Sequence, residues 1–169
     1  MPKGAIIEIG VWRGGTGALI AKQAKECGIP SKVYLCDTFT GIVKSGPEDS
    51  TYKTGDLSNK TRQAVENLIF KQMNLDNVQI LDGIFPDHTS HEIDDVQFRA
   101  CHIDVDVYQS AKDIMDWLWG RIIPGGIVIF DDYGFMACDG ITKFVEEHLH
   151  DKDKLLIYNL TGQAVVVKI

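Results

Sequence analysis

The chain has 169 residues, enough for one domain with a buried core and too few for two. It carries 17 basic and 24 acidic residues, and the net charge of −7 argues against binding to nucleic acid or to an anionic membrane. No apolar run approaches the roughly 20 residues needed to cross a bilayer, and the N-terminus has no signal-peptide layout. The four cysteines (Cys27, Cys36, Cys101 and Cys138) show no zinc-type spacing; we expect them to be reduced and the protein to be cytoplasmic.

The first half of the chain alternates short apolar runs with helical patterns. Strands are predicted over 5–10, 32–37 and 78–81, and helices over 16–27 and 61–73. The polar segment 41–59 is long for a connection inside a compact domain, so we expect it to be a mobile lid or a binding loop.

The second half continues the alternation, with strands over 98–104 and 127–130, helices over 108–119 and 138–148, and two final strands over 155–159 and 164–168. The turn Pro124–Gly126 precedes the strand that stops at two adjacent aspartates. The last two strands lie so close in sequence that they must form an antiparallel hairpin. The pattern predicts an α/β fold with a doubly wound, mostly parallel seven-stranded sheet in a single domain, 1–169.

A glycine-rich turn follows the first strand, with Glu8, Gly10 and Gly14 at its start. It lacks the G-x-G-x-x-G register of a dinucleotide site, because Trp12 stands where the second glycine belongs, and this disfavours an oxidoreductase. Glu8 could hold an ammonium group, and the helix that begins near Thr16 offers free N–H groups to a carboxylate. An amino acid has both groups, although a tight strand–helix turn without a ligand would have the same sequence.

Asp37 ends the second strand, where an acid in a doubly wound fold commonly accepts hydrogen bonds from ribose hydroxyls. The alternative is a surface aspartate that caps the next turn. An amino acid joined to a nucleoside is S-adenosylmethionine, and Asp82 and Gly83, after the third strand, would then lie near its base.

Three carboxylates are predicted to meet at the ends of two adjacent strands. Asp104 ends the strand over 98–104, and Asp131 and Asp132 end the next strand. Without a cation such a group would repel itself, and oxygen ligands suit Mg²⁺ or another hard divalent cation. The alternative places Asp132 as a cap of the following helix, with no metal.

Four motifs resemble the macrocin O-methyltransferase (TylF-type) family of S-adenosylmethionine-dependent, Mg²⁺-dependent enzymes. They are IDVDVYQS at 103–110, PGG at 124–126 followed by DDYG at 131–134, DTFTG at 37–41, and GIFPD at 83–87. The resemblance covers nearly the whole chain and implies a Rossmann-like class I methyltransferase that methylates a hydroxyl of a sugar or a phenolic small molecule.

The resemblance also implies roles for individual residues. The implied cofactor-binding residues are Glu8, Gly10, Gly14, Thr16, Asp37, Thr38, Asp82, Gly83 and Asp104. The implied metal ligands are Asp104, Asp131 and Asp132. The resemblance suggests Asp104 as the catalytic base, and Asp106 is the reserve. His88 departs from the family pattern, which tends to show threonine there; it could be an extra base, and the alternative is a solvent-exposed loop histidine.

One departure from the family concerns the N-terminus. Family members usually carry substantial sequence before the first strand, whereas here that strand begins within about five residues of the start, so we expect little or no N-terminal cap. The short N-terminus motivates one alternative function, a non-catalytic domain that binds S-adenosylmethionine. A separate alternative is a metal-independent methyltransferase, with a carboxylate or His88 alone as the base. The C-terminal hairpin and exposed aromatic side chains could also serve a homodimer.

Overall fold

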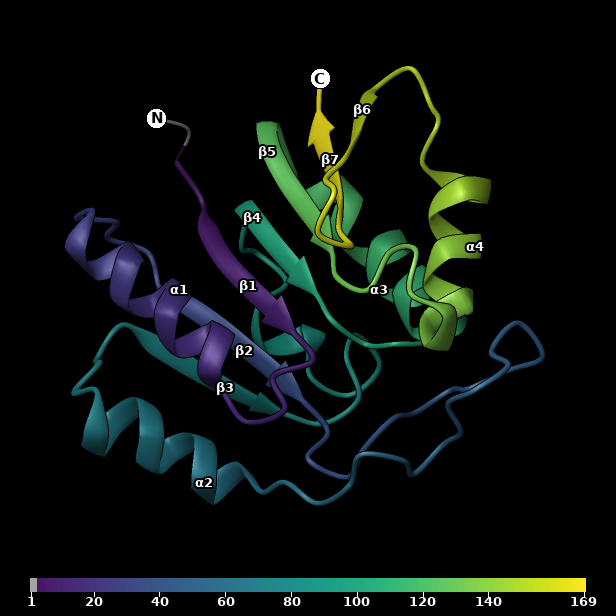
Figure 1. Ribbon diagram of the computed structural model, residues 1–169. Coiled ribbons are helices and arrows are strands. Elements are labelled where there is room, and N and C mark those ends of the chain that lie inside the picture. The colour runs from purple at the N-terminus through teal and green to yellow at the C-terminus, as the bar shows by residue number, and fades with distance from the viewer. Residues whose placement is uncertain (1–2) are drawn as a thin grey trace.

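A computed structural model describes residues 3–169, which form one seven-stranded sheet in the order β3-β2-β1-β4-β5-β7-β6 (Figure 1). The strands are β1 (Ala5–Ile9), β2 (Val33–Asp37), β3 (Val78–Asp82), β4 (Phe98–Ile103), β5 (Ile122–Phe130), β6 (Lys154–Tyr158) and β7 (Ala164–Lys168). Strands β1 to β5 pair in parallel, and β7 pairs antiparallel with β5 and β6. The predicted sheet and its C-terminal hairpin are confirmed.

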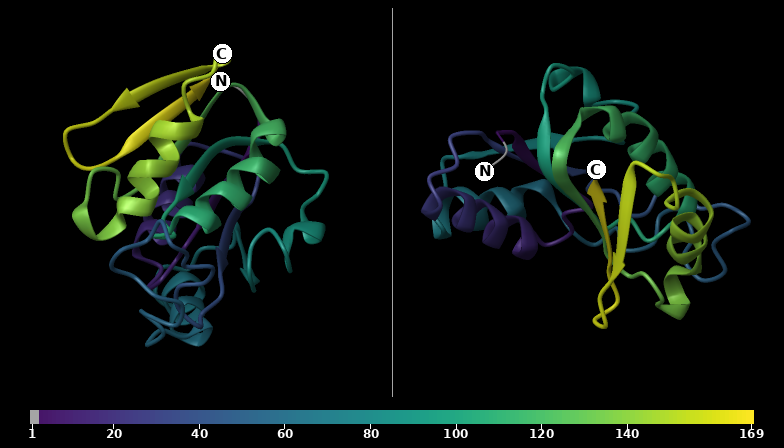
Figure 2. Two further views of the ribbon diagram at one scale, coloured as in Figure 1. Left: turned by 90° about the vertical axis from the view of Figure 1, so that its right-hand side faces the viewer. Right: turned by 90° about the horizontal axis from the view of Figure 1, so that it is seen from above.

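Helices cover both faces of the sheet (Figures 1 and 2). They are α1 (Gly15–Glu26), α2 (Arg62–Glu66), α3 (Tyr108–Leu118) and α4 (Asp139–His148). The helix predicted over 61–73 is divided, because α2 continues as a π-helical segment, Asn67–Gln72. No helix within residues 3–169 is long and apolar enough to span a membrane; Met1 and Pro2 lie outside the described residues.

Two apolar cores lie on opposite faces of the sheet. The core under α3 and α4 includes Phe98, Ile114 and Phe144, all almost fully buried. The core under α1 and α2 is smaller and includes Leu35 and Ile69. Because each strand of the parallel region is covered by a core on at least one face, its carboxyl end is held in a fixed position at one edge of the sheet.

The Pro-Gly-Gly turn predicted before β5 is instead a bulge inside that strand. The pairing with β4 advances from Phe98–Ile122 to Ala100–Ile127, so β5 contains extra residues opposite a short stretch of β4. Gly125 supplies the positive φ, 75°, that such an irregularity needs. The strand therefore starts at Ile122 rather than after the glycines.

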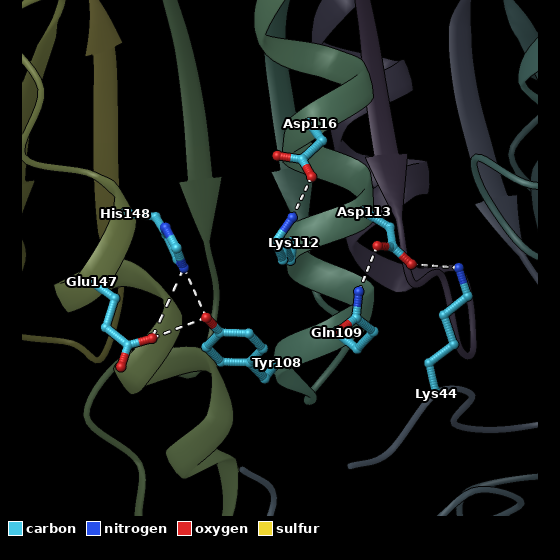
Figure 3. Close-up of polar contacts among 8 residues, drawn as sticks. All are labelled: Lys44, Tyr108, Gln109, Lys112, Asp113, Asp116, Glu147 and His148. Carbon is cyan, nitrogen blue, oxygen red and sulfur yellow. Dashed lines mark hydrogen bonds and ion pairs between the residues drawn. The ribbon is translucent and has the colours of Figure 1, made fainter. Parts of the chain in front are cut away.

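Segment 41–59 has no helix or strand, but its first part is attached to α3. Asp49 is buried and accepts a hydrogen bond from the amide of Tyr108, in the first turn of α3 (2.9 Å). Lys44 forms ion pairs with Asp113 on α3 (2.6 Å) and with Asp87 (2.8 Å); Figure 3 shows the first of these. These contacts fix the path of the chain just after β2, next to the sheet edge.

Candidate active site

A cavity of about 360 Å³ lies at the carboxyl ends of β1 to β5. The predicted site residues that line it are Gly10, Asp37, Thr38, Gly83, Asp104, Asp131 and Asp132. Glu8, Gly14, Thr16 and Asp82 are predicted site residues that do not line it. The roles of both groups remain predictions, because the cavity shows which side chains meet and not what they bind.

Gly10 brings the ends of β1 and β4 into contact. Its φ is 88°, and a Cβ at this position would lie 1.7 Å from the carbonyl oxygen of Asp104. The amide of Asp104 also donates to the carbonyl of Ile9 (2.8 Å). Any side chain at position 10 would push Asp104 away, so this glycine positions the acidic side of the cavity as well as opening space for a ligand.

The carboxylate of Asp37 orders the glycine-rich turn. Its Oδ2 accepts hydrogen bonds from the amides of Val11 (2.7 Å) and Trp12 (2.8 Å), and its Oδ1 accepts one from the amide of Phe39 (2.7 Å). A carboxylate oxygen has two lone pairs, so Oδ1 can accept one further hydrogen bond from a ligand hydroxyl. The surface-cap alternative is partly correct, since Asp37 does bond to nearby backbone.

Two residues near β3 take other positions. Asp82 is exposed and lies 3.6 Å from Arg62 on α2, measured between Oδ2 and Nη1. His88 is also exposed, and its Nδ1 accepts from the amide of Ile84 (3.4 Å). Neither side chain lines the cavity, whereas Gly83 does. His88 is therefore poorly placed to act as the base.

Four half-buried carboxylates gather on the other side of the cavity: Asp104, Asp106, Asp131 and Asp132. Burial, together with the neighbouring negative charges, raises the pKa of Asp104 to about 7 and that of Asp106 to about 6. Carboxylates that retain protons near neutral pH mark a place where a hard dication would relieve repulsion. This donor set therefore fits the magnesium that the sequence motifs imply.

Asp132 belongs to this group and does not cap α4. That helix begins at Asp139, and its N-cap residue is Cys138. Among residues 3–169, ligand atoms of Asp106, Asp132 and Cys138 lie within 4.8 Å of one another, whereas the predicted trio of Asp104, Asp131 and Asp132 does not form so close a group. Asp106 and Asp132 both have left-handed backbone (φ 63° and 60°), a conformation that is uncommon outside glycine but that aspartate tolerates.

A buried histidine connects Asp131 to Glu8. His102 Nδ1 lies 3.2 Å from Glu8 Oε1, and its Nε2 lies 3.7 Å from Asp131 Oδ2. Burial lowers the pKa of His102, but its contacts with Asp131 and Glu8 outweigh this and raise it to about 10. Neither His102 nor Gln163, which donates to Asp131 Oδ1 (3.1 Å), was identified from the sequence, since only the strand register brings them to Asp131.

Comparison with known proteins gives the family. The model of the macrocin O-methyltransferase (TylF) family matches residues 2–157, which is most of the chain. The chain belongs to the TylF family.

Individual relatives of this TylF-family chain are O-methyltransferases. A tetracenomycin-C rhamnosyl 4′-O-methyltransferase from Streptomyces olivaceus is 30% identical over 146 residues, covering 80% of this chain and 55% of the relative. Mycinamicin III 3″-O-methyltransferase from Micromonospora griseorubida is 27% identical, covering 86% and 61%. The O-methyltransferase NovP has a similar structure, with a TM-score of 0.80 and 26% identity over 98% of this chain and 72% of NovP. The chain thus spans only part of the length of these relatives, about three fifths or less of the two sequence relatives.

Proposed function

We propose that this chain transfers a methyl group from S-adenosylmethionine to a hydroxyl of a sugar or a phenolic small molecule. The observation that carries this proposal is the cavity itself, which has Gly10, Asp37 and Gly83 on one side and a group of protonatable carboxylates on the other. Membership of the TylF family supports the reaction, and the names of the relatives support a hydroxyl acceptor.

The β1–β3 side of the cavity would bind the cofactor. Asp37 Oδ1 has a free lone pair for a ribose hydroxyl, and Thr38 donates its own hydroxyl to the carbonyl of Gly41 (2.9 Å), which fixes the chain beside it. Gly83 has a φ of 151° and lies on the cavity wall. These positions support a role in holding the nucleoside part of S-adenosylmethionine.

The β4–β5 side would activate the acceptor. Bound Mg²⁺, held by Asp104, Asp131 and Asp132, would stabilise negative charge on the acceptor oxygen, and bound S-adenosylmethionine would supply the methyl group. Asp104 would accept the hydroxyl proton, because it lines the cavity where the ends of β1 and β4 meet and therefore borders both the cofactor side and the acidic side. Asp106, whose pKa is raised to about 6, is the second candidate for this role.

The test is a set of substitutions in the acidic group. Asp104→Asn and Asp131→Asn should each lower Mg²⁺-dependent formation of S-adenosylhomocysteine by about 100-fold or more, measured with a panel of glycosides and phenols. Binding of S-adenosylhomocysteine, measured by calorimetry, should change little in Asp131→Asn, because Asp131 is not among the implied cofactor-binding residues. Asp116→Asn, on the exposed surface of α3, is the matched control and should behave as the parent.

Two results would contradict parts of this proposal. Full activity of Asp131→Ala in EDTA would exclude the metal and favour a metal-independent methyltransferase. Tight cofactor binding without methyl transfer to any acceptor of the panel would favour a domain that binds the cofactor without catalysis.

A further inference from the structure

The register of the sheet places an ionisable pair in an otherwise apolar row. Glu8 on β1 pairs with His102 on β4, which pairs with Ile129 on β5, and Ile129 pairs with Val165 on β7. Glu8 and His102 are 1% and 7% exposed. Burying two ionisable side chains costs free energy that apolar residues at these positions would not cost.

The same register brings His102 to Asp131. Side chains alternate along a strand, so Asp131 lies on the same face as Ile129, two residues earlier and beside His102. The Nε2 of His102 is 3.7 Å from Asp131 Oδ2, while its Nδ1 is occupied by Glu8 at 3.2 Å. Glu8 therefore fixes the orientation of the ring that reaches Asp131.

The C-terminal hairpin supplies the second contact. Ala164 on β7 pairs antiparallel with Phe130, so Gln163 lies opposite Asp131. Its Nε2 donates to Asp131 Oδ1 (3.1 Å), and its Oε1 accepts from Nδ2 of Asn159 (2.7 Å). Asn159 thus turns the amide of Gln163 so that the donor faces the carboxylate.

We propose that His102 and Gln163 are positioning residues that hold the two oxygens of Asp131 in the orientation required of a metal ligand. The proposal rests on the proposed function, in which Asp131 binds Mg²⁺. Without these contacts the Asp131 side chain, which is 33% exposed, would be free to rotate towards solvent. Groups that orient a ligand in this way typically contribute about 10-fold to 100-fold in metal affinity.

The experiment measures binding of Mn²⁺, as a probe for the metal, by calorimetry in the presence of S-adenosylhomocysteine. Gln163→Leu removes one contact at a half-buried position of the hairpin, and Thr161→Val, an exposed position in the same turn, is its matched control. At position 102, glutamine retains an amide near the place of Nε2, which faces Asp131. Asparagine retains one near the place of Nδ1, which faces Glu8.

We expect Gln163→Leu and His102→Asn to weaken Mn²⁺ binding by about 10-fold or more, and His102→Gln to weaken it less. Affinity for S-adenosylhomocysteine should stay within about twofold of the parent in Gln163→Leu, because Gln163 contacts Asp131 and Asn159 and none of the implied cofactor-binding residues. If the position 102 variants do not fold, Gln163→Leu against Thr161→Val decides the question.

Parental Mn²⁺ affinity in Gln163→Leu and His102→Asn would overturn the inference while leaving the metal centre intact. An equal loss of Mn²⁺ and S-adenosylhomocysteine binding would overturn it too, since that pattern indicates general damage. A parent chain that transfers methyl groups but binds no Mn²⁺ would overturn the metal centre and this inference together, and would leave the methyltransferase assignment standing.

Discussion

Asp106 is a residue of the cavity whose ionisation destabilises the folded chain. Burial and the charge of Asp132 raise its pKa from 3.8 to about 6, so the folded protein binds this proton more tightly than the unfolded chain does. The stabilisation from Asp106 is therefore complete below about pH 4 and is lost as the pH rises through 6. At pH 8, without metal, the ionised side chain lowers the free energy of unfolding.

Because ionised Asp106 lowers stability at high pH, removing its charge should raise stability there. Asp106→Asn should be more stable than the parent by about 1 to 2 kcal/mol at pH 8, with the difference shrinking towards pH 4. Urea unfolding in EDTA at pH 5 and pH 8 measures it. A variant less stable than the parent at pH 8 would show that Asp106 is held by favourable contacts rather than opposed by its neighbours.

The sequence predicts this acidic group but not how its members are held. Asp104, Asp131 and Asp132 each follow an apolar run, and the carboxyl ends of adjacent parallel strands meet at one edge of the sheet. The sequence alone therefore predicts that these three residues converge. The contact of Glu8 with His102 depends instead on strand order and register. Strand order and register are set by packing of the whole sheet. The glycine-rich motif that suggested an ammonium-binding role for Glu8 contains no information about either.

At the scale of elements, periodicity gives the strands and helices but misses two irregularities. The π-helical segment Asn67–Gln72 has the composition of an ordinary helix, and the change of hydrogen-bond pattern depends on local packing. Pro124–Gly126 has the composition of a turn, yet β4 pairs on both sides of it and makes it a bulge. In both places the local sequence does not specify the backbone geometry, because the same composition is compatible with the regular alternative.

Segment 41–59 gives the second prediction. Lys44 has a 20% exposed side chain and pairs with carboxylates on two other parts of the chain, Asp87 and Asp113. Lys44→Met should loosen the start of the segment, which the hydrogen bond between Asp49 and Tyr108 still joins to α3. It should lower the thermal midpoint by about 2 to 5 °C and raise the KM for cofactor or acceptor, because Gly41–Val43 line the cavity. Hydrogen exchange should show faster exchange confined mainly to 41–59.

The matched control for this change lies on the same helix. Lys112 pairs with Asp116 one turn further along α3, at the same 2.6 Å (Figure 3). Both of these side chains are more exposed than those of Lys44 and Asp113. Exposed pairs contribute roughly 0 to 1 kcal/mol, so Lys112→Met should leave KM unchanged. Equal effects of the two substitutions would mean that loss of a surface charge, rather than release of the segment, explains the result.

At the scale of the molecule, negative charge is concentrated where the cofactor is expected to bind. The chain has a net charge of −7. Among the described residues that line the cavity, five are aspartates and one, Lys60, is basic. A concave site lined by one sign of charge focuses the electrostatic potential, and this cavity should attract cations.

The last prediction uses this potential. S-adenosylmethionine carries a sulfonium charge that S-adenosylhomocysteine lacks, so without metal the chain should prefer the former. The preference should fall by roughly twofold to fivefold between 50 and 500 mM NaCl, because salt screens the field of the partly exposed carboxylates. Asp132→Asn should reduce the preference at low salt, whereas Asp116→Asn should not, and calorimetry with both ligands measures each ratio. A preference that rises with salt would mean that apolar contacts, and not the acidic side of the cavity, distinguish the cofactor from its product.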